Sequence, residues 1–197
     1  AMELINNTSK TLKDDLSVEI KKGSKLSIAA ACFSIYAFQE LKKQLTSIEE
    51  LRFIFTSPTF VAEKTKKEKR EFYIPRLNRE RSLYGTEFEI KLRNEMTQKA
   101  IAKECADWIK EKVTFKSNIS DKTIQGQLVV DDTGYTPINN FTTVELGCEK
   151  GNVISTTIVK DQSLAQTLIR DFNEIWNDKK VLQEVTDEVV ESITAAY

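Results

Sequence analysis

The residues of this chain that could perform acid-base chemistry are carboxylates, because the sequence contains no histidine. Asp131 and Asp132 are adjacent, and Glu145 and Glu149 are four residues apart. Two carboxylates can act as general acid and general base when their pKa values differ. Two adjacent acids in an Asp-Asp-Thr-Gly sequence are, however, typical of a turn. We therefore expect no catalytic residue here, and the absence of histidine also excludes imidazole catalysis and a His/Cys zinc site.

The sequence also lacks a nucleotide-binding motif. A phosphate-binding loop ends in Gly-Lys-Ser or Gly-Lys-Thr, whereas Gly23-Ser24-Lys25 has a different order. We expect no cofactor and no metal. Cys32, Cys105 and Cys148 are odd in number and widely spaced, which favours free thiols in a reducing compartment and hence a cytoplasmic protein.

Length and composition predict one domain that covers residues 1–197. The chain is 40% hydrophobic and 30% charged, which is ordinary for a globular domain. No apolar run approaches the roughly 20 residues that span a bilayer, so we expect no membrane contact. The 29 basic residues nearly balance the 30 acidic ones, so nucleic-acid binding would need a local patch.

Residues 64–81 form such a patch, the basic segment, in which eight basic residues stand against three acidic ones. Lys and Arg contacts to phosphate dominate nucleic-acid affinity, and aromatics such as Phe72 and Tyr84 can stack on bases. The alternative is a solvated helix face whose cations pair with nearby glutamates and whose aromatics turn into the core. The candidate nucleic-acid-binding residues are Lys66, Lys67, Lys69, Arg70, Arg76, Arg79 and Arg81.

The middle of the fold is predicted to be the strand at residues 124–131. Leu128, Val129 and Val130 form a continuous apolar run. A turn at Asp131 closes this run, which is typical of a short strand buried on both faces. Such strands are usually central in a sheet.

Hydrophobic periodicity predicts the elements around this strand. Strand, helix and strand follow one another over residues 26–55, which implies a parallel pair. We therefore expect an α/β fold with a mixed sheet flanked by helices. The predicted helices cover residues 12–20, 37–45, 97–112 (capped by Thr97), 161–176 and 180–196, and the predicted strands cover residues 26–33, 51–55, 113–116, 124–131, 135–144 and 152–159.

This order of elements resembles one phospholipase D-like domain. That family carries the pattern His-x-Lys-x-x-x-x-Asp on a buried strand, and with Asp131 as the acid the other positions fall on Ile124 and Gly126. Residues 137–143 occupy the place of the family's small-residue and Asn motif. The resemblance therefore implies a degenerate site without the nucleophile and without the phosphate-binding cation.

Longer segments resemble the N-terminal region of bacterial DEAD/DEAH-box helicases of the Swi/Snf type. They are residues 26–60, residues 72–85 with the sequence Phe-Tyr-Ile-Pro-Arg-Leu-Asn-Arg-Glu-Arg-Ser-Leu-Tyr-Gly, and residues 98–116. In such proteins a phospholipase D-like domain precedes the ATP-driven motor. The resemblance implies downstream helicase domains in cis, into which the last helix, about residues 180–197, leads.

Three functions compete on this basis. We expect a non-catalytic accessory domain of an ATP-dependent DNA or RNA helicase that assists nucleic-acid binding or assembly. The first alternative is an active phosphodiesterase or nuclease of the phospholipase D class, against which the absence of histidine argues. The second is a pure protein-interaction or dimerisation module. Because active members of the family build one site from two such domains, a single copy also suggests a homodimer.

Overall fold

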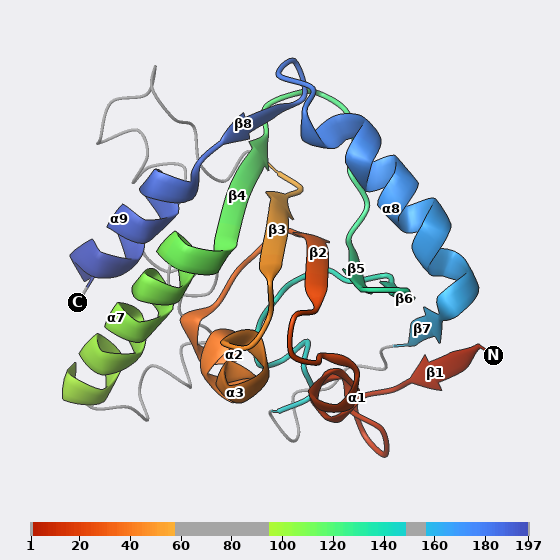
Figure 1. Ribbon diagram of the computed structural model, residues 1–197, viewed down its shortest axis with the longest axis horizontal. Coiled ribbons are helices and arrows are strands. Elements are labelled where there is room, and N and C mark those ends of the chain that lie inside the picture. The colour runs from red at the N-terminus through yellow and green to blue at the C-terminus, as the bar shows by residue number, and fades with distance from the viewer. Residues whose placement is uncertain (1, 58–94, 149–156, 197) are drawn as a thin grey trace.

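The computed structural model describes residues 2–57, 95–148 and 157–196. This part of the chain forms one eight-stranded mixed sheet with the order β1-β7-β6-β5-β2-β3-β4-β8 (Figure 1). The strands are β1 (Glu3–Ile5), β2 (Lys25–Ala30), β3 (Glu50–Phe55), β4 (Val113–Asn118), β5 (Gln127–Val130), β6 (Thr133–Thr136), β7 (Ile158–Asp161) and β8 (Leu182–Glu184). The helices are α1 (Leu12–Glu19), α2 (Ile35–Glu40), α3 (Lys42–Leu45), α7 (Glu95–Lys112), α8 (Gln162–Trp176) and α9 (Thr186–Ala196).

The centre of the sheet is a parallel group of three strands. β3 pairs in parallel with both β2 and β4, so that Phe53 lies opposite Ile28 on one side and Phe115 on the other. β5 is antiparallel to β2, with Leu128 opposite Ile28. The predicted parallel pair and the central position of the buried strand are both confirmed.

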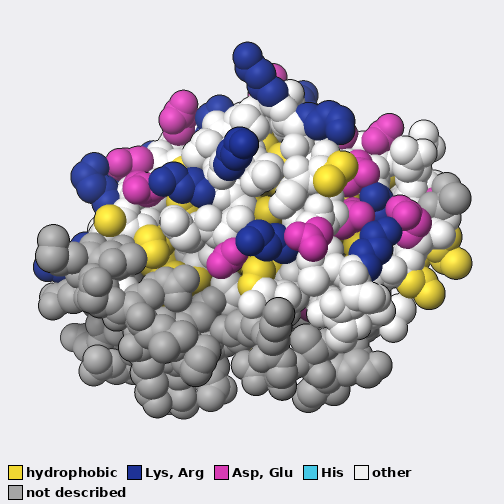
Figure 2. All heavy atoms as spheres, turned by 90° about the horizontal axis from the view of Figure 1, so that it is seen from below, with side chains coloured by type: hydrophobic (Ala, Val, Ile, Leu, Met, Phe, Trp, Pro, Cys, Tyr) yellow, Lys and Arg dark blue, Asp and Glu magenta, His cyan; other side chains and the backbone are white. Residues whose placement is uncertain are grey.

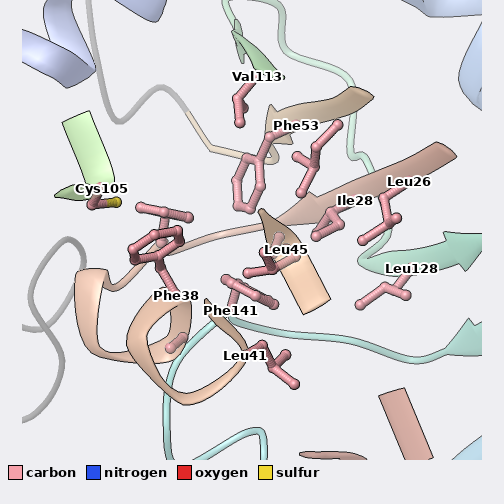
Figure 3. Packing of buried hydrophobic residues seen from close by; sticks show 14 of the residues in the cluster. Leu26, Ile28, Phe38, Leu41, Leu45, Phe53, Cys105, Val113, Leu128 and Phe141 are labelled. Carbon is pink, nitrogen blue, oxygen red and sulfur yellow. The ribbon is translucent and has the colours of Figure 1, made fainter. Parts of the chain in front are cut away.

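The main core lies between the sheet and the helices α1, α2, α7 and α9 (Figures 1 and 3). The Phe53 ring lies 5.8 Å from the Phe33 ring and 5.1 Å from the Phe115 ring. Trp108 and Cys105 of α7 are buried in the same core, as predicted. The Trp108 indole donates a hydrogen bond of 2.8 Å to the Leu45 carbonyl, and burial raises the pKa of the Cys105 thiol well above its usual value.

A smaller core lies on the opposite face, which α8 covers (Figure 1). Phe172 of α8 packs on Ala29 and Ile54 of the sheet, with Val181 and Leu182 beside them. α8 begins where predicted, because the Asp161 carboxylate accepts a hydrogen bond of 3.0 Å from the Ser163 amide.

Several predicted boundaries were wrong. The helix predicted at residues 37–45 is two short helices, α2 and α3, with a break at Leu41. The strand predicted at residues 135–144 ends at Thr136, because Pro137 has no amide hydrogen to donate to a sheet. The helix predicted at residues 97–112 begins at Glu95, so Thr97 lies inside α7. The strand predicted to begin at Ile124 begins at Gln127.

Two edge strands were missed. β1 and β8 have three residues each, which is too short for an alternating pattern to stand out. β8 lies within the helix predicted at residues 180–196, so the observed helix, α9, begins at Thr186. Residues 182–184 form a strand rather than the start of the helix because they pair with β4.

Candidate functional site

The edge of the sheet where the parallel strands end is the place where open α/β sheets bind their ligands. β2, β3 and β4 end at this edge, here called the carboxyl edge. β5 is antiparallel to β2 and therefore begins there, and β6 ends there before Pro137. The topology thus brings Ile124, Gly126 and residues 137–140 to one place.

Gly126 cannot carry a side chain in this backbone. A Cβ atom at this position would lie 1.4 Å from the carbonyl oxygen of Ile138 and 3.2 Å from that of Ala29. The Ile138 amide also donates a hydrogen bond of 3.1 Å to the Gly126 carbonyl, which holds the two segments together. The space that a lysine would need at the motif position is therefore filled by main chain.

Ile124 has a packing role. Its side chain is half-buried against the smaller core under α8. It also lines a pocket of about 270 Å³ between α8 and the sheet, together with Ala29, Ile54, Gln127, Asp171 and Phe172 among others. The pocket wall mixes apolar side chains with amides, a hydroxyl and one carboxylate, and isoleucine stands where the family has its histidine.

Asp131 lies at the opposite end of β5. It is five positions along the chain from Gly126, which corresponds to about 17 Å along a strand. Its backbone has a φ of 51°, and its carboxylate accepts hydrogen bonds from the Ser24 hydroxyl (2.7 Å) and the Lys25 amide (2.9 Å). Asp131 therefore closes a turn onto the start of β2, and the structure does not bring it together with Ile124 and Gly126.

The loop after β6 is held by Glu145. One oxygen of its carboxylate, Oε1, accepts hydrogen bonds from the amides of Asn139 (2.7 Å) and Asn140 (2.8 Å). Burial raises the pKa of Glu145, and the two amide donors oppose this effect. The carboxylate is committed to the loop, while Glu149, the partner considered from the sequence, lies outside the described residues.

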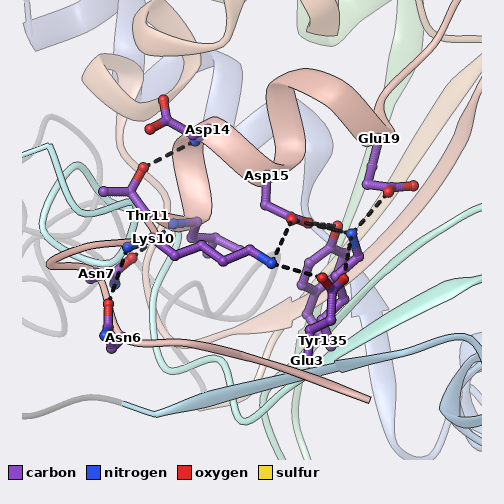
Figure 4. A network of polar contacts seen from close by, with 11 residues as sticks. Glu3, Asn6, Asn7, Lys10, Thr11, Asp14, Asp15, Glu19 and Tyr135 are labelled. Carbon is purple, nitrogen blue, oxygen red and sulfur yellow. Dashed lines mark hydrogen bonds and ion pairs between the residues drawn. The ribbon is translucent and has the colours of Figure 1, made fainter. Parts of the chain in front are cut away.

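A second group of ionisable side chains joins α1 to the sheet (Figure 4). The Asp15 carboxylate accepts a hydrogen bond of 2.6 Å from the Tyr135 hydroxyl and forms an ion pair of 3.1 Å with Lys160. Lys160 also pairs with Glu19 at 2.9 Å and with Glu3 at 3.4 Å. Every charge in this group has an opposite partner, so we interpret it as a structural network.

Sequence reasoning missed two cations on the face of the sheet that α8 covers. Arg52 of β3 lies 4.8 Å from the Phe172 ring, and Lys116 of β4 lies 4.4 Å from the Trp176 ring. A signal for them exists in the sequence, because Arg52 interrupts the apolar run Leu51–Phe55 and Lys116 follows Phe115 in an alternating strand. Alternation places both on the face opposite the main core.

The candidate nucleic-acid-binding residues of the basic segment lie outside the described residues. Within the described part, Figure 2 shows basic and acidic side chains interspersed on one face of the molecule. That face shows no broad surface of a single charge sign among the described residues.

The searches against family models and curated proteins found no match. Solved structures are similar in fold. The chain aligns over its full length with 44% of the phosphatidylserine synthase of Haemophilus influenzae Rd KW20, at 12% identity and a TM-score of 0.50. It also aligns over 93% of its length with 53% of TrmBL2, an archaeal chromatin protein with a novel mode of DNA binding, at 12% identity and a TM-score of 0.43.

The chain thus spans about half the length of these two structures. Similarity at this identity shows the fold alone. The predicted class, an α/β phospholipase D-like domain with a mixed sheet flanked by helices, is confirmed. Among the helices that the structure describes, none combines the length and the apolar character needed to cross a membrane.

Proposed function

We propose that this chain is a non-catalytic phospholipase D-like accessory domain that assists nucleic-acid binding or assembly of an ATP-dependent DNA or RNA helicase. The observation that carries the first half of the proposal is the contact at Gly126. A phosphate-binding cation has no room at this position, since the Ile138 carbonyl occupies it. The nucleophile position is Ile124, which packs on the smaller core.

The second half of the proposal is supported by the sequence. Three segments between residues 26 and 116 resemble the N-terminal region of bacterial Swi/Snf-type helicases, which implies downstream motor domains in cis. The basic segment carries a local excess of five positive charges in a chain whose total charge is near zero. Arginine side chains bind phosphate in a bidentate geometry, so residues 76–81 are suited to a nucleic-acid backbone.

Two assays test the two halves separately. Incubation with a phosphodiester substrate and with a labelled DNA should give no turnover. Turnover that Asp131→Ala does not alter would point to a contaminating nuclease, whereas turnover that this change abolishes would establish the alternative, an active phosphodiesterase. The Asp131 variant needs a check of folding, because its carboxylate closes a turn.

Binding of labelled single-stranded DNA and RNA should weaken steeply with salt. The triple change Arg76→Ala, Arg79→Ala and Arg81→Ala should lower the magnitude of the slope of log K against log salt concentration by about two, since each lost phosphate contact removes about 0.7. The matched control changes Lys22, Lys43 and Lys110 to alanine. These three lysines are exposed, and the change removes the same number of positive charges. Unchanged affinity with lost thermal stability in the arginine variant would instead assign these arginines to internal pairing.

A further inference from the structure

Arg52 and Lys116 form a pair of cations on neighbouring strands. In the parallel pairing of β3 and β4, Lys116 lies opposite Ile54, two residues along from Arg52 on the same face. The indole ring of Trp176 lies near both, 5.4 Å from the Arg52 guanidinium and 4.4 Å from the Lys116 ammonium. The Trp176 ring at the end of α8 therefore contacts both cations.

Their hydrogen bonds go to neutral acceptors. Arg52 donates to the Asn173 side-chain oxygen (2.8 Å) and to the Ser27 hydroxyl (3.0 Å), and Lys116 donates to the Trp176 carbonyl (2.8 Å). Within residues 2–57, 95–148 and 157–196, no carboxylate forms an ion pair with either cation. Lys160, by contrast, is paired with three carboxylates.

Both charges are partly desolvated. Burial lowers the pKa of Arg52, and it also lowers the pKa of Lys116, where the charges of Arg52 and Lys179 act in the same direction. Glu50 and Glu184 oppose these effects, but at longer range than an ion pair. Partly buried charges usually have a partner of opposite sign, so the pair is suited to an anionic ligand.

Donors remain for such a ligand. A guanidinium has five N–H donors and an ammonium has three, and the bonds above use two and one of them respectively. The two side chains lie on the same face of adjacent strands, and the Trp176 ring is within 5.4 Å of both cations. A pocket of about 270 Å³ on the same face is lined by Phe172, whose ring contacts Arg52, and by both apolar and polar side chains.

We propose that Arg52 and Lys116 form a binding site for a phosphoryl group on the face of the sheet that α8 covers. The group would accept charge-assisted hydrogen bonds from both side chains. It could belong to a nucleic-acid strand or to a small phosphorylated molecule, and both share this chemistry. The site does not depend on the basic segment, so it can exist even if the proposed function is wrong.

The two tryptophans of the chain allow a direct test on the full 197-residue chain. With ¹⁵N-labelled indole groups, a spectrum shows one signal each for Trp108 and Trp176. Titration with inorganic pyrophosphate should shift the Trp176 signal in a saturable way and leave the buried Trp108 signal unchanged. Sodium chloride at the same ionic strength should not produce the shift.

The variants Arg52→Gln and Lys116→Gln should each weaken pyrophosphate binding by about tenfold, as expected for the loss of a hydrogen bond to a charged group. The control Lys103→Gln removes a cation whose side chain is 80% exposed on α7 and should bind like the unmodified chain. A native Trp108 signal shows that a variant is folded. If Arg52→Gln unfolds, Arg52→Lys keeps the charge and should retain binding.

A parallel titration with a single-stranded thymidine oligomer of about ten nucleotides distinguishes the two sources of phosphate. Saturation of the Trp176 shift at a lower concentration of oligomer than of pyrophosphate would support a nucleic-acid strand, and the reverse would support a small phosphorylated molecule. The proposal would be overturned by the absence of a saturable shift with either probe, by an equal shift with chloride, or by unchanged binding in both glutamine variants. The two cations would then serve only to tether α8 to the sheet.

Discussion

At the scale of single residues, Gly126 stands where the related family has its lysine, and its backbone leaves no room for a side chain. We predict that Gly126→Ala lowers the free energy of unfolding by at least about 2 kcal/mol, because the added Cβ would overlap the Ile138 carbonyl and main chain must move. Urea denaturation measures the loss. The matched control is Gly23→Ala, where no atom lies within 4 Å and the cost, about 1 kcal/mol, comes from the positive φ of 80°. Equal stabilities of the two variants would contradict the close contact at Gly126.

Tyr135 and Lys160 make a prediction about pH. Burial and the hydrogen bond to Asp15 raise the pKa of Tyr135. At Lys160, burial lowers the pKa, but hydrogen bonds to Glu19 and Asp15 outweigh burial, so the pKa of Lys160 is also raised. In the unfolded chain these groups lose their protons near pH 10. The unfolded state therefore holds fewer protons than the folded state above that pH, and stability that is fully present below about pH 10 is lost as the pH rises.

The slope of this loss is up to about 1.4 kcal/mol per pH unit for each of the two groups. Tyr135→Phe should reduce the slope between about pH 10 and 11 by about half, measured by urea denaturation at each pH. Lys103→Gln, which removes an exposed pair with Asp107, should leave the slope unchanged. An unchanged slope in Tyr135→Phe would show that the hydroxyl is not coupled to Asp15.

Among the elements, α2 depends on a buried cap. The Ser34 hydroxyl is fully buried and accepts hydrogen bonds from the amides of Tyr36 (3.0 Å) and Ala37 (3.4 Å). Ser34→Ala should lower the free energy of unfolding by about 1–2 kcal/mol, because it removes the acceptor for amides that water cannot reach. Ser9→Ala, at an exposed position, should change it by less than about 0.5 kcal/mol. A loss at Ser34 no larger than that at Ser9 would contradict the cap.

The elements also show what sequence reasoning could reach. Long periodic segments such as α7 and α8 were predicted to within a few residues, because their apolar positions repeat every three or four residues. The short strands β1 and β8 were missed, because their structure comes from pairing with distant segments. For the candidate site, the motif positions Ile124, Gly126 and Asp131 were assigned from the family resemblance alone. Their separation in space, and the contact of Gly126 with Ile138, depend on how β5 and the following loop fold back.

At the scale of the whole molecule, the family resemblance predicts self-association. It implies that active members build one site from two such domains. In a chain with one such domain, an identical chain related by a twofold axis would pack on the surface that the second domain contacts in active members. The carboxyl edge around Gln125 and Gly126 is where this surface is expected.

We therefore predict that sedimentation shows a dimer at a concentration on the order of tens of micromolar.

Gln125→Lys should weaken this dimer, because Gln125 is exposed at the carboxyl edge and a twofold axis there would bring the two introduced charges near each other. Leu4→Lys is the control, since Leu4 is 56% exposed on β1 at the outer edge of the sheet, far along the strand order from β2, β3 and β4. A dimer lost in Leu4→Lys but kept in Gln125→Lys would move the interface to the β1 edge, where unpaired main-chain groups can join two sheets. A monomer at all concentrations would contradict the predicted self-association.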